Sequence, residues 1–312
     1  MAKVVVVGGP CIDEYYRWDH YPKLGDKINS YFIKAVPGGI MANAAAVIGS
    51  LGNDCQILCN LGDDDYTELL LDTLHDGHVK TDCVHVSKKA RTLKLPIMMV
   101  GSERMIIVPV FEDEFPFDCT PECMKLLEAA DCVYTNIVDL KRVKGYEALL
   151  SHLREKKIKI MMDAESSTFD SYESERLFFD AADVLSFNDF SLEKFTGKTG
   201  PAAEEAVARF IGQSDKIVLM TQGAKGCIIR TRNERVEIPA FPVDVVDTTG
   251  AGDTFNGAFL HRLLRGDTLQ DAGTFAAAAA ARCITIMDPR AGAASEAAVR
   301  EFMQAFGARK EL

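Results

Sequence analysis

The stretch VDTTGAGDTFNG, residues 246–257, decides how the rest of this 312-residue chain is interpreted. Gly250, Ala251 and Gly252 carry almost no side chain, so a ligand can approach the backbone closely. An apolar helical pattern follows from Phe255, and the first N–H groups of such a helix have no partner within it. Together with the helix dipole, these groups favour an anion. The stretch therefore predicts a phosphoryl-binding helix start.

Asp253 stands at the start of the same predicted helix. A carboxylate beside a phosphoryl site suggests a base for a substrate hydroxyl. An ordinary helix cap is the alternative, because Asp and Thr often open helices. A cap does not explain the small residues of the turn or the second acid, Asp247. We therefore interpret Asp253 as catalytic, with Gly250, Ala251 and Gly252 at the phosphoryl group.

Residues 247–255, DTTGAGDTF, resemble the C-terminal signature of the ribokinase-like (PfkB) family of sugar and nucleoside kinases. Residues 37–52, PGGIMANAAAVIGSLG, resemble a second signature of this family. Gly39 lets the backbone approach a ligand, and Asn43, one helical turn later, offers a donor and an acceptor to sugar hydroxyls. The alternative is a glycine turn before a packed alanine-rich helix. The resemblance implies that Gly39 and Asn43 contact the substrate.

The N-terminal run of four valines, residues 4–7, predicts a buried parallel strand that ends at a glycine turn. No G-x-G-x-x-G follows it, which disfavours a nicotinamide dehydrogenase. Asp13 follows this turn, and by itself it would be interpreted as a turn residue. The family resemblance implies that Asp13 instead binds substrate hydroxyls.

Strands alternate with helices along the chain, which predicts an α/β fold with a doubly wound, mostly parallel sheet flanked by helices. Ligands then sit at the carboxyl ends of the strands. We expect strands at 56–61, 132–137, 158–162 and 184–187, and helices at 120–129, 141–155 and 274–283. The whole chain, residues 1–312, is interpreted as a single ribokinase-like domain.

Two segments, at about 15–36 and 84–110, are predicted to form a small β lid. The first has an irregular alternating pattern, and in the family this region covers the sugar. In the second, residues 95–100 and 105–108 are apolar and flank a turn, which predicts a hairpin. A core hairpin is the alternative. Their apolar content favours a lid that also forms a homodimer contact.

The family resemblance also implies ATP and Mg²⁺. It places Asn188, Thr221, Gly223 and Gly226 at the nucleotide. The glutamate that the family carries three residues after this asparagine is Ser191 here, so how the chain organises Mg²⁺ stays open. A water held by Ser191 and the nearby acid Glu165 are two candidates.

A monovalent cation, K⁺, is a further expectation from the resemblance. Its candidate ligands are Asp247 and Thr249, together with the loop at residues 288–295. Asp163, which follows a predicted strand, resembles an acid of the family but lacks the usual residues after it and is left without a role.

Composition limits the partners. The net charge is −11 and no block of Lys and Arg occurs, which disfavours nucleic acid and anionic membranes. No apolar run approaches the roughly 20 residues that span a bilayer. The nine cysteines are expected to be reduced and mostly buried, as in a cytoplasmic protein.

We therefore predict an ATP-dependent carbohydrate kinase that phosphorylates a hydroxyl of a small sugar or sugar-like polyol, with Asp253 as the base. One alternative is a nucleoside kinase on the same fold, in which Tyr15, Tyr16, Trp18 or Phe111 would stack on the base. The other is a non-catalytic sugar- or nucleotide-binding relative, which the departure at Ser191 suggests.

Overall fold

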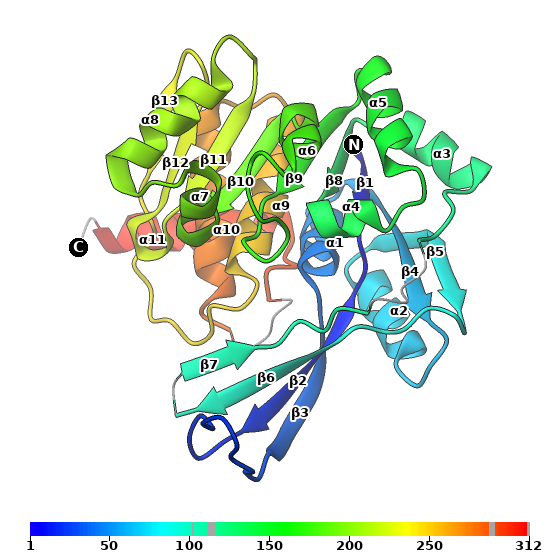
Figure 1. The fold of residues 1–312 in the computed structure, drawn as a ribbon. Coiled ribbons are helices and arrows are strands. Elements are labelled where there is room, and N and C mark those ends of the chain that lie inside the picture. Colours follow the sequence, from blue (N-terminus) through cyan, green and yellow to red (C-terminus); the bar gives the residue numbers. More distant parts are fainter. Residues whose placement is uncertain (102, 112–115, 287–290, 311–312) are drawn as a thin grey trace.

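A computed structural model of the chain describes residues 1–101, 103–111, 116–286 and 291–310, with side chains as far as Gly307. Within these ranges the strands form two sheets, a large one between two layers of helices and a smaller one that projects from it (Figure 1). The strand order of the large sheet is β13-β12-β11-β10-β9-β8-β1-β4-β5. Neighbouring strands run parallel from β5 to β11, and β12 and β13 are antiparallel. The predicted doubly wound, mostly parallel sheet is confirmed.

The strands of the large sheet are β1 (Lys3–Val7), β4 (Asp54–Gly62), β5 (Val79–Ser87), β8 (Cys132–Thr135), β9 (Lys159–Asp163), β10 (Val184–Asn188), β11 (Ile217–Thr221), β12 (Cys227–Arg230) and β13 (Arg235–Ile238). Alternate residues of a strand face opposite sides of the sheet, so the four valines of β1 enter two different cores. Val4 and Val6 pack in one core, and Val5 and Val7 pack in the other. Burial on both faces explains the continuous apolar run.

The helices divide between these two cores. One layer contains α1 (Ile40–Ser50), α2 (Thr67–Asp76), α9 (Ala251–Leu264), α10 (Leu269–Cys283) and α11 (Glu296–Lys310). The other contains α3 (Pro121–Glu128), α4 (Ile137–Lys141), α5 (Tyr146–Glu155), α6 (Arg176–Ala181), α7 (Asp189–Thr196) and α8 (Gly200–Ile211). A short 3-10 turn, η1 (Gly223–Lys225), follows β11.

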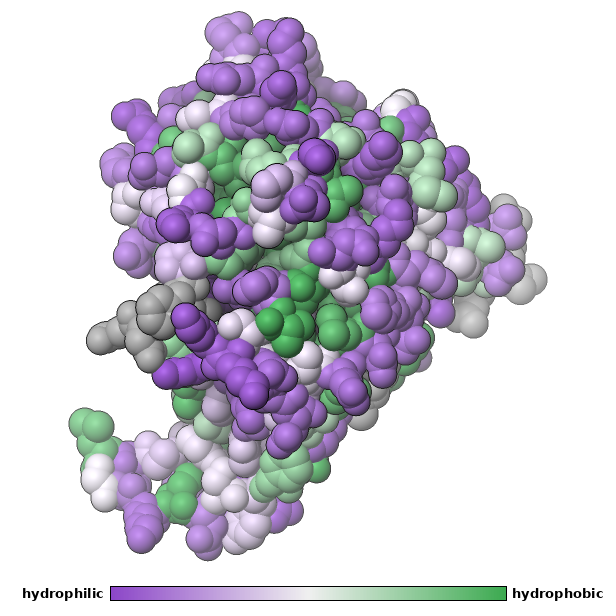
Figure 2. All heavy atoms as spheres, turned by 90° about the vertical axis from the view of Figure 1, so that its right-hand side faces the viewer, coloured by the Kyte–Doolittle hydropathy of each residue, from purple (hydrophilic) through white to green (hydrophobic). Residues whose placement is uncertain are grey.

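The smaller sheet has the order β3-β2-β6-β7 and contains β2 (Cys11–Arg17), β3 (Tyr31–Gly38), β6 (Lys94–Val100) and β7 (Glu103–Ile106). It is built from the two segments expected to form the lid, and it projects below the main body, as Figure 2 also shows from the side. The bounds differ, because β2 begins at Cys11, β3 ends at Gly38, and residues 84–87 belong to β5 in the large sheet. Val79 and Cys83 anchor β5 there by facing the core.

Several expected elements have different bounds. The helix expected over 274–283 begins earlier, at Leu269. The helix expected over 141–155 is interrupted, because α4 ends at Lys141 and α5 begins at Tyr146. Gly145, with φ of 72°, lies between them in the left-handed region, which no α-helix contains. The strand expected over 132–137 ends at Thr135, because the Asn136 side chain caps α4.

The cysteines correct another expectation. Cys83 and Cys123 form a disulfide between β5 and α3, so the prediction of reduced thiols was wrong for this pair. The other seven cysteines are free, and all of them except Cys119 are buried. Over the described ranges we find no helix with the length and apolarity that a bilayer span requires.

Candidate active site

The helices α1 and α9 each begin after a glycine, and they pack against each other. Gly39, with φ of 104°, precedes α1, and a Cβ at this position would lie 2.9 Å from the carbonyl oxygen of Gly9. Gly250, with φ of 75°, precedes α9. Further along α9, a Cβ on Gly257 would lie 3.0 Å from Cγ1 of Val47, so glycine allows the two helices to pack closely. Each helix start supplies N–H groups that have no partner within its own helix, although the Ala251 N–H donates to the carbonyl oxygen of Thr248 at 3.3 Å.

Asn43 and Asp253 meet at this point. The Asn43 amide donates a hydrogen bond of 2.8 Å from Nδ2 to Oδ2 of Asp253. Asn43 is only 6% exposed, and its Oδ1 is buried without a partner among the described atoms. A buried polar atom without a partner is costly, so this oxygen is suited to accept a hydrogen bond from a ligand hydroxyl. The structure thus brings together two residues that are 210 positions apart.

The surroundings of Asp253 tune its acidity. The pKa of Asp253 is raised to about 7, mainly by burial. The charges of Glu165 and Asp13 act in the same direction, whereas hydrogen bonds from Asn43 and from its own backbone act in the opposite direction. From the sequence we expected the positive helix start to keep this carboxylate ionised, and burial opposes that effect. A carboxylate with a pKa near 7 is well matched to accept a proton at neutral pH.

A second polar layer lies beneath Asp253. Asp163, at the end of β9, accepts hydrogen bonds from Nδ2 of Asn256 at 3.1 Å and from the hydroxyl of Tyr134 at 3.4 Å. Ser186 donates to Asn256 at 2.7 Å. Burial raises the pKa of Asp163 to about 8, with smaller contributions from the charges of Asp253 and Glu165. We did not single out Asn256 from the sequence, although its position three residues after Asp253 places both on one helix face.

Asp13 lies on the lid side of the same region, in β2, and is 6% exposed. A Cβ at Gly38 would lie only 2.4 Å from Oδ2 of Asp13, so a glycine is required next to this carboxylate. The charge of Asp13 contributes to the raised pKa of Asp253, which shows that the two carboxylates share one environment. The predicted substrate residues Asp13, Gly39 and Asn43 are therefore gathered beside Asp253.

The predicted nucleotide residues lie at the same edge of the sheet. Asn188 and Thr221 are register partners at the ends of β10 and β11. Gly223 and Gly226, with φ of 55° and 97°, shape the turn after β11. At Gly226 a Cβ would lie 2.0 Å from the carbonyl oxygen of Ile238, so no larger residue fits there.

Glu165 connects these residues to Asp253. Asn188 donates a hydrogen bond of 3.0 Å from Nδ2 to Oε2 of Glu165. Ser191 is committed to a capping box, because it donates from its backbone N–H to Asn188 Oδ1 and accepts from the Asn188 N–H, both at 2.9 Å. Of the two candidates for organising Mg²⁺, Glu165 therefore carries the carboxylate that faces the site. No group of three or more His, Cys, Asp or Glu side chains with metal-binding geometry occurs among the described residues.

Asp247 and Thr249 contact the lid. Arg104 of β7 donates a hydrogen bond of 2.7 Å from Nη1 to Oγ1 of Thr249, and the same nitrogen lies 3.9 Å from Oδ1 of Asp247. Asp247 also accepts from the Thr249 N–H at 2.9 Å. Residues 287–290 of the loop expected to complete a K⁺ site lie outside the described residues. Arg104, which we did not single out from the sequence, ties the lid to the loop before α9.

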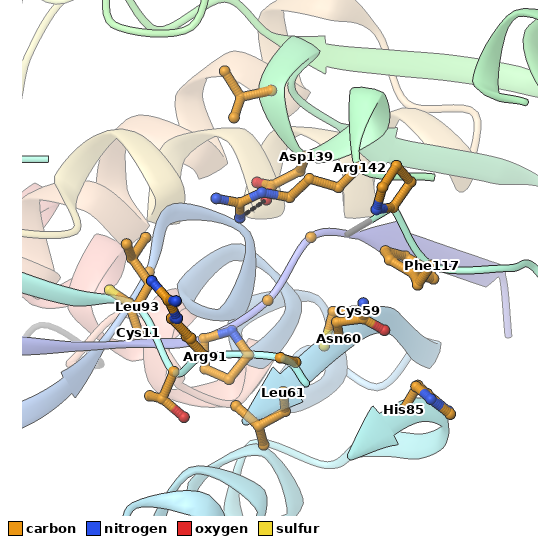
Figure 3. A pocket seen from close by; sticks show the side chains of 18 of the residues that line it. Cys11, Cys59, Asn60, Leu61, His85, Arg91, Leu93, Phe117, Asp139 and Arg142 are labelled. Carbon is orange, nitrogen blue, oxygen red and sulfur yellow. Dashed lines mark hydrogen bonds and ion pairs between the residues drawn. The ribbon is translucent and has the colours of Figure 1, made fainter. Parts of the chain in front are cut away.

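A cavity of about 500 Å³ lies next to the substrate residues. Its wall includes Gly9, Cys11, Gly39 and Ile40, and it extends outward between β5 and α4 (Figure 3). Asp13, Asn43 and Asp253 are not among its lining residues, but Cys11 contacts Asp13 through a sulfur–oxygen distance of 3.5 Å. The volume is typical of a small-molecule site.

Three features indicate the class of protein: the doubly wound sheet, the two helix starts that meet, and the cavity beside them. They are typical of enzymes that modify small molecules at the carboxyl edge of a parallel sheet. The family model described as pfkB family carbohydrate kinase matches residues 1–295. The chain therefore belongs to the pfkB family and is a carbohydrate kinase.

Individual relatives agree with this assignment. The chain is 30% identical to fructokinase-1 of Zea mays over 262 residues, which cover 77% of each chain. It is 25% identical to the ribokinase of Bacillus subtilis (strain 168) over 304 residues, which cover 97% of this chain and all of that one. Among solved structures it resembles Arabidopsis thaliana ribokinase complexed with ribose and ATP, with a TM-score of 0.83, 25% identity, and coverage of 97% and 99% of the two chains.

Proposed function

We propose that this carbohydrate kinase transfers the terminal phosphoryl group of ATP to a hydroxyl of a small sugar or polyol, with Asp253 as the general base. The contact between Asn43 and Asp253 at the meeting point of two helix starts carries this proposal. It combines an acceptor for a substrate hydroxyl, a base with a pKa of about 7, and N–H groups suited to a phosphoryl group. The A. thaliana ribokinase with ribose and ATP supports the pairing of a sugar with this nucleotide.

The proposed reaction follows from these positions. Asp13 and Asn43 hold the sugar so that one hydroxyl faces Asp253. That hydroxyl attacks the terminal phosphorus of ATP, its proton passes to Asp253, and the bond from phosphorus to the bridging oxygen breaks to release ADP. The N–H groups around Gly250, Ala251 and Gly252 stabilise charge on the transferring group, which is the main contribution of protein to phosphoryl transfer. The lid excludes water, which would otherwise compete as the acceptor.

Mg²⁺ fits the chemistry of this edge. Carboxylate oxygens are its preferred protein ligands, and it usually retains several waters. Glu165, held by Asn188, is the residue that we propose to organise Mg²⁺ through water or directly, in place of an acid at Ser191. When bound with ATP, the ion neutralises phosphate charge. Positive charge near Glu165 also favours the ionised form of the neighbouring Asp253.

Asp247 and Thr249 stay the proposed ligands of a monovalent cation. The Arg104 guanidinium beside Asp247 already supplies positive charge there, so we expect only a modest difference between rates in KCl and in tetramethylammonium chloride.

The test is ADP release across a panel of sugars, sugar acids, sugar phosphates and nucleosides. Turnover of a sugar or polyol is the expected result. Preferential turnover of a nucleoside would favour the nucleoside kinase, for which Tyr15 is the best-placed aromatic residue. Burial raises the pKa of Tyr15, and the charges of Asp13 and Asp247 act in the same direction, so Tyr15 of lid strand β2 is near both of these acids. Binding without turnover of any compound would favour the non-catalytic alternative.

A further inference from the structure

Cationic side chains from separate elements line the cavity beside the substrate residues. Lys89 and Arg91 come from the segment between β5 and β6, and Arg142 is the C-cap of α4. Figure 3 shows the guanidinium groups of Arg91 and Arg142 facing the same space, Arg91 beside Cys11 and Leu93 and Arg142 beside Asp139. The chain as a whole has a net charge of −11, so this gathering of cations is a local feature.

Among the described residues, the two acidic side chains that line the cavity have cationic partners. Asp139 lies 3.2 Å from Nη1 of Arg142, and Asp118 lies 3.1 Å from Nζ of Lys144, which is not a lining residue. A guanidinium has five N–H donors in a planar fork, so Arg142 can contact Asp139 and a further oxyanion together. The guanidinium of Arg91 lies over the ring of Phe111, 5.0 Å from its centroid, which orients the group through its face.

Both arginines are attached to the elements that hold the substrate residues. Arg91 is two residues before Leu93, whose carbonyl accepts from the Ile12 N–H at 2.8 Å, next to Asp13 in β2. Asp139, the partner of Arg142, packs against the turn after β1, since a Cβ at Gly8 would lie 2.6 Å from its Oδ2. Both arginines therefore line a cavity whose wall also includes Cys11 and Gly39, which lie close in sequence to Asp13 and Asn43.

We propose that the acceptor carries an anionic group, a phosphate or a carboxylate, and that Arg91 and Arg142 bind this group at the end remote from the phosphorylated hydroxyl. The inference rests on the proposed function, because Asp253 defines which end of the acceptor reacts. The hydroxyl groups of Thr168 and Ser167, which line the same cavity, supply further donors. The acceptor is then a sugar phosphate or a sugar acid, and a neutral sugar is the weaker substrate.

The test compares matched acceptors at saturating ATP. Neutral sugars of four to six carbons are paired with the same sugars carrying a terminal phosphate or a terminal carboxylate, for example D-fructose with D-fructose 6-phosphate and D-glucose with D-gluconate. We expect an anionic member to have a kcat/KM at least about tenfold above that of its neutral partner. The phosphate and carboxylate arms identify which of the two anions is used. A neutral sugar that equals or exceeds every anionic partner would overturn the proposal.

Arginine variants locate the effect. R91Q and R142Q should each raise KM for the anionic acceptor by about 10- to 100-fold, with a smaller change in kcat and little change for the neutral partner. R142K retains the charge and should recover part of the loss. The control is R154Q, because Arg154 lies on the surface, 3.4 Å from Asp183. Equal losses for charged and neutral acceptors would mean that these arginines only support the fold.

Binding to D253N separates this inference from the proposed function. Calorimetric titration of D253N with the same compounds requires no turnover. An anionic compound that binds D253N but is not phosphorylated by the unaltered enzyme would contradict the proposed reaction and support the anion subsite. If neither enzyme form binds any anionic compound better than its neutral partner, the subsite does not exist.

Discussion

Replacing Asp253 with asparagine separates catalysis from a structural role in the first turn of α9. The substitution preserves size, and the side-chain oxygen of asparagine can still accept the hydrogen bond that Asn43 now donates at 2.8 Å. The N-cap of α9 is Gly250 and no side chain of the described residues caps this helix, so the substitution removes no cap. Asparagine cannot take a proton from a substrate hydroxyl. We therefore expect kcat to fall by about 10²- to 10⁴-fold, or about 3 to 5 kcal/mol of activation free energy, while ATP binding stays nearly unchanged.

The pH dependence of the unaltered enzyme provides a second measurement. Because the pKa of Asp253 is about 7, kcat/KM should rise about tenfold per pH unit below 7 and level off above it. The slope arises because only the ionised carboxylate accepts a proton. D253N should lose this dependence.

Stability should change in the opposite direction from activity. The pKa of Asp253 is raised in the folded state from its ordinary value of 3.8, so folding favours the protonated form. That contribution is fully present below the unfolded pKa and is lost as pH rises through about 7. Asparagine is never ionised, so D253N should have a higher free energy of unfolding at pH 8, by on the order of 1 kcal/mol.

The assay is single-substrate kinetics on the best acceptor, with ATP binding measured by calorimetry and unfolding by denaturant titration at pH 5 and pH 8. D271N is the matched control, because Asp271 occupies the same third position of α10 but is exposed, away from the site. It should change kcat little. A D253N enzyme with near-normal kcat would refute the catalytic role and leave Asp253 as a structural residue of the first turn of α9. The gain in free energy of unfolding of D253N over the unaltered chain should be larger at pH 8 than at pH 5. The opposite order would contradict the conclusion that burial raises the pKa of Asp253.

Three further outcomes are expected. Glu165→Gln should raise the Mg²⁺ concentration needed for half-maximal rate, and it should weaken Mn²⁺ binding in the presence of ATP, measured by electron paramagnetic resonance. Ser191→Glu should lower that Mg²⁺ concentration. Unchanged metal dependence in both variants would contradict the proposed role of Glu165. Arg104→Ala removes the lid's 2.7 Å contact with Thr249 and should raise the acceptor KM several-fold more than it lowers kcat; a normal KM would show that this contact does not hold the lid. The outer lid strands carry exposed apolar residues, such as Phe32 (61% exposed) and Ile106 (47% exposed). The chain should therefore sediment as a dimer, and Phe32→Asp should dissociate it. A strict monomer at micromolar concentration would exclude this contact.

The local features of this chain could be predicted from the sequence because each depends on short-range chemistry. The four valines of β1 indicated a strand buried on both faces, and the small residues at 250–252 indicated a helix start open to a ligand. The alternation of strands and helices was sufficient for the doubly wound sheet. Gly145 shows the limit, because nothing in the amphipathic pattern around it revealed that a left-handed residue separates α4 from α5.

The arrangement of the site depended on contacts between residues distant in the sequence. Asn43 and Asp253 are joined because α1 and α9 pack closely against each other, which Gly257 allows. The pKa of Asp253 was misjudged because burial, which opposes the effect of the helix start, is a property of the packed interior.

Other partners became visible only in the tertiary structure. Glu165 meets Asn188 because β9 and β10 are neighbours in the large sheet, and Arg104 reaches Thr249 because the lid folds over the loop before α9. Residue types and local spacing therefore determined the class of fold and the candidate base. The tertiary structure decided which charges face that base and the cavity, because electrostatic interactions depend on distance in space and on burial, and neither follows from separation along the chain.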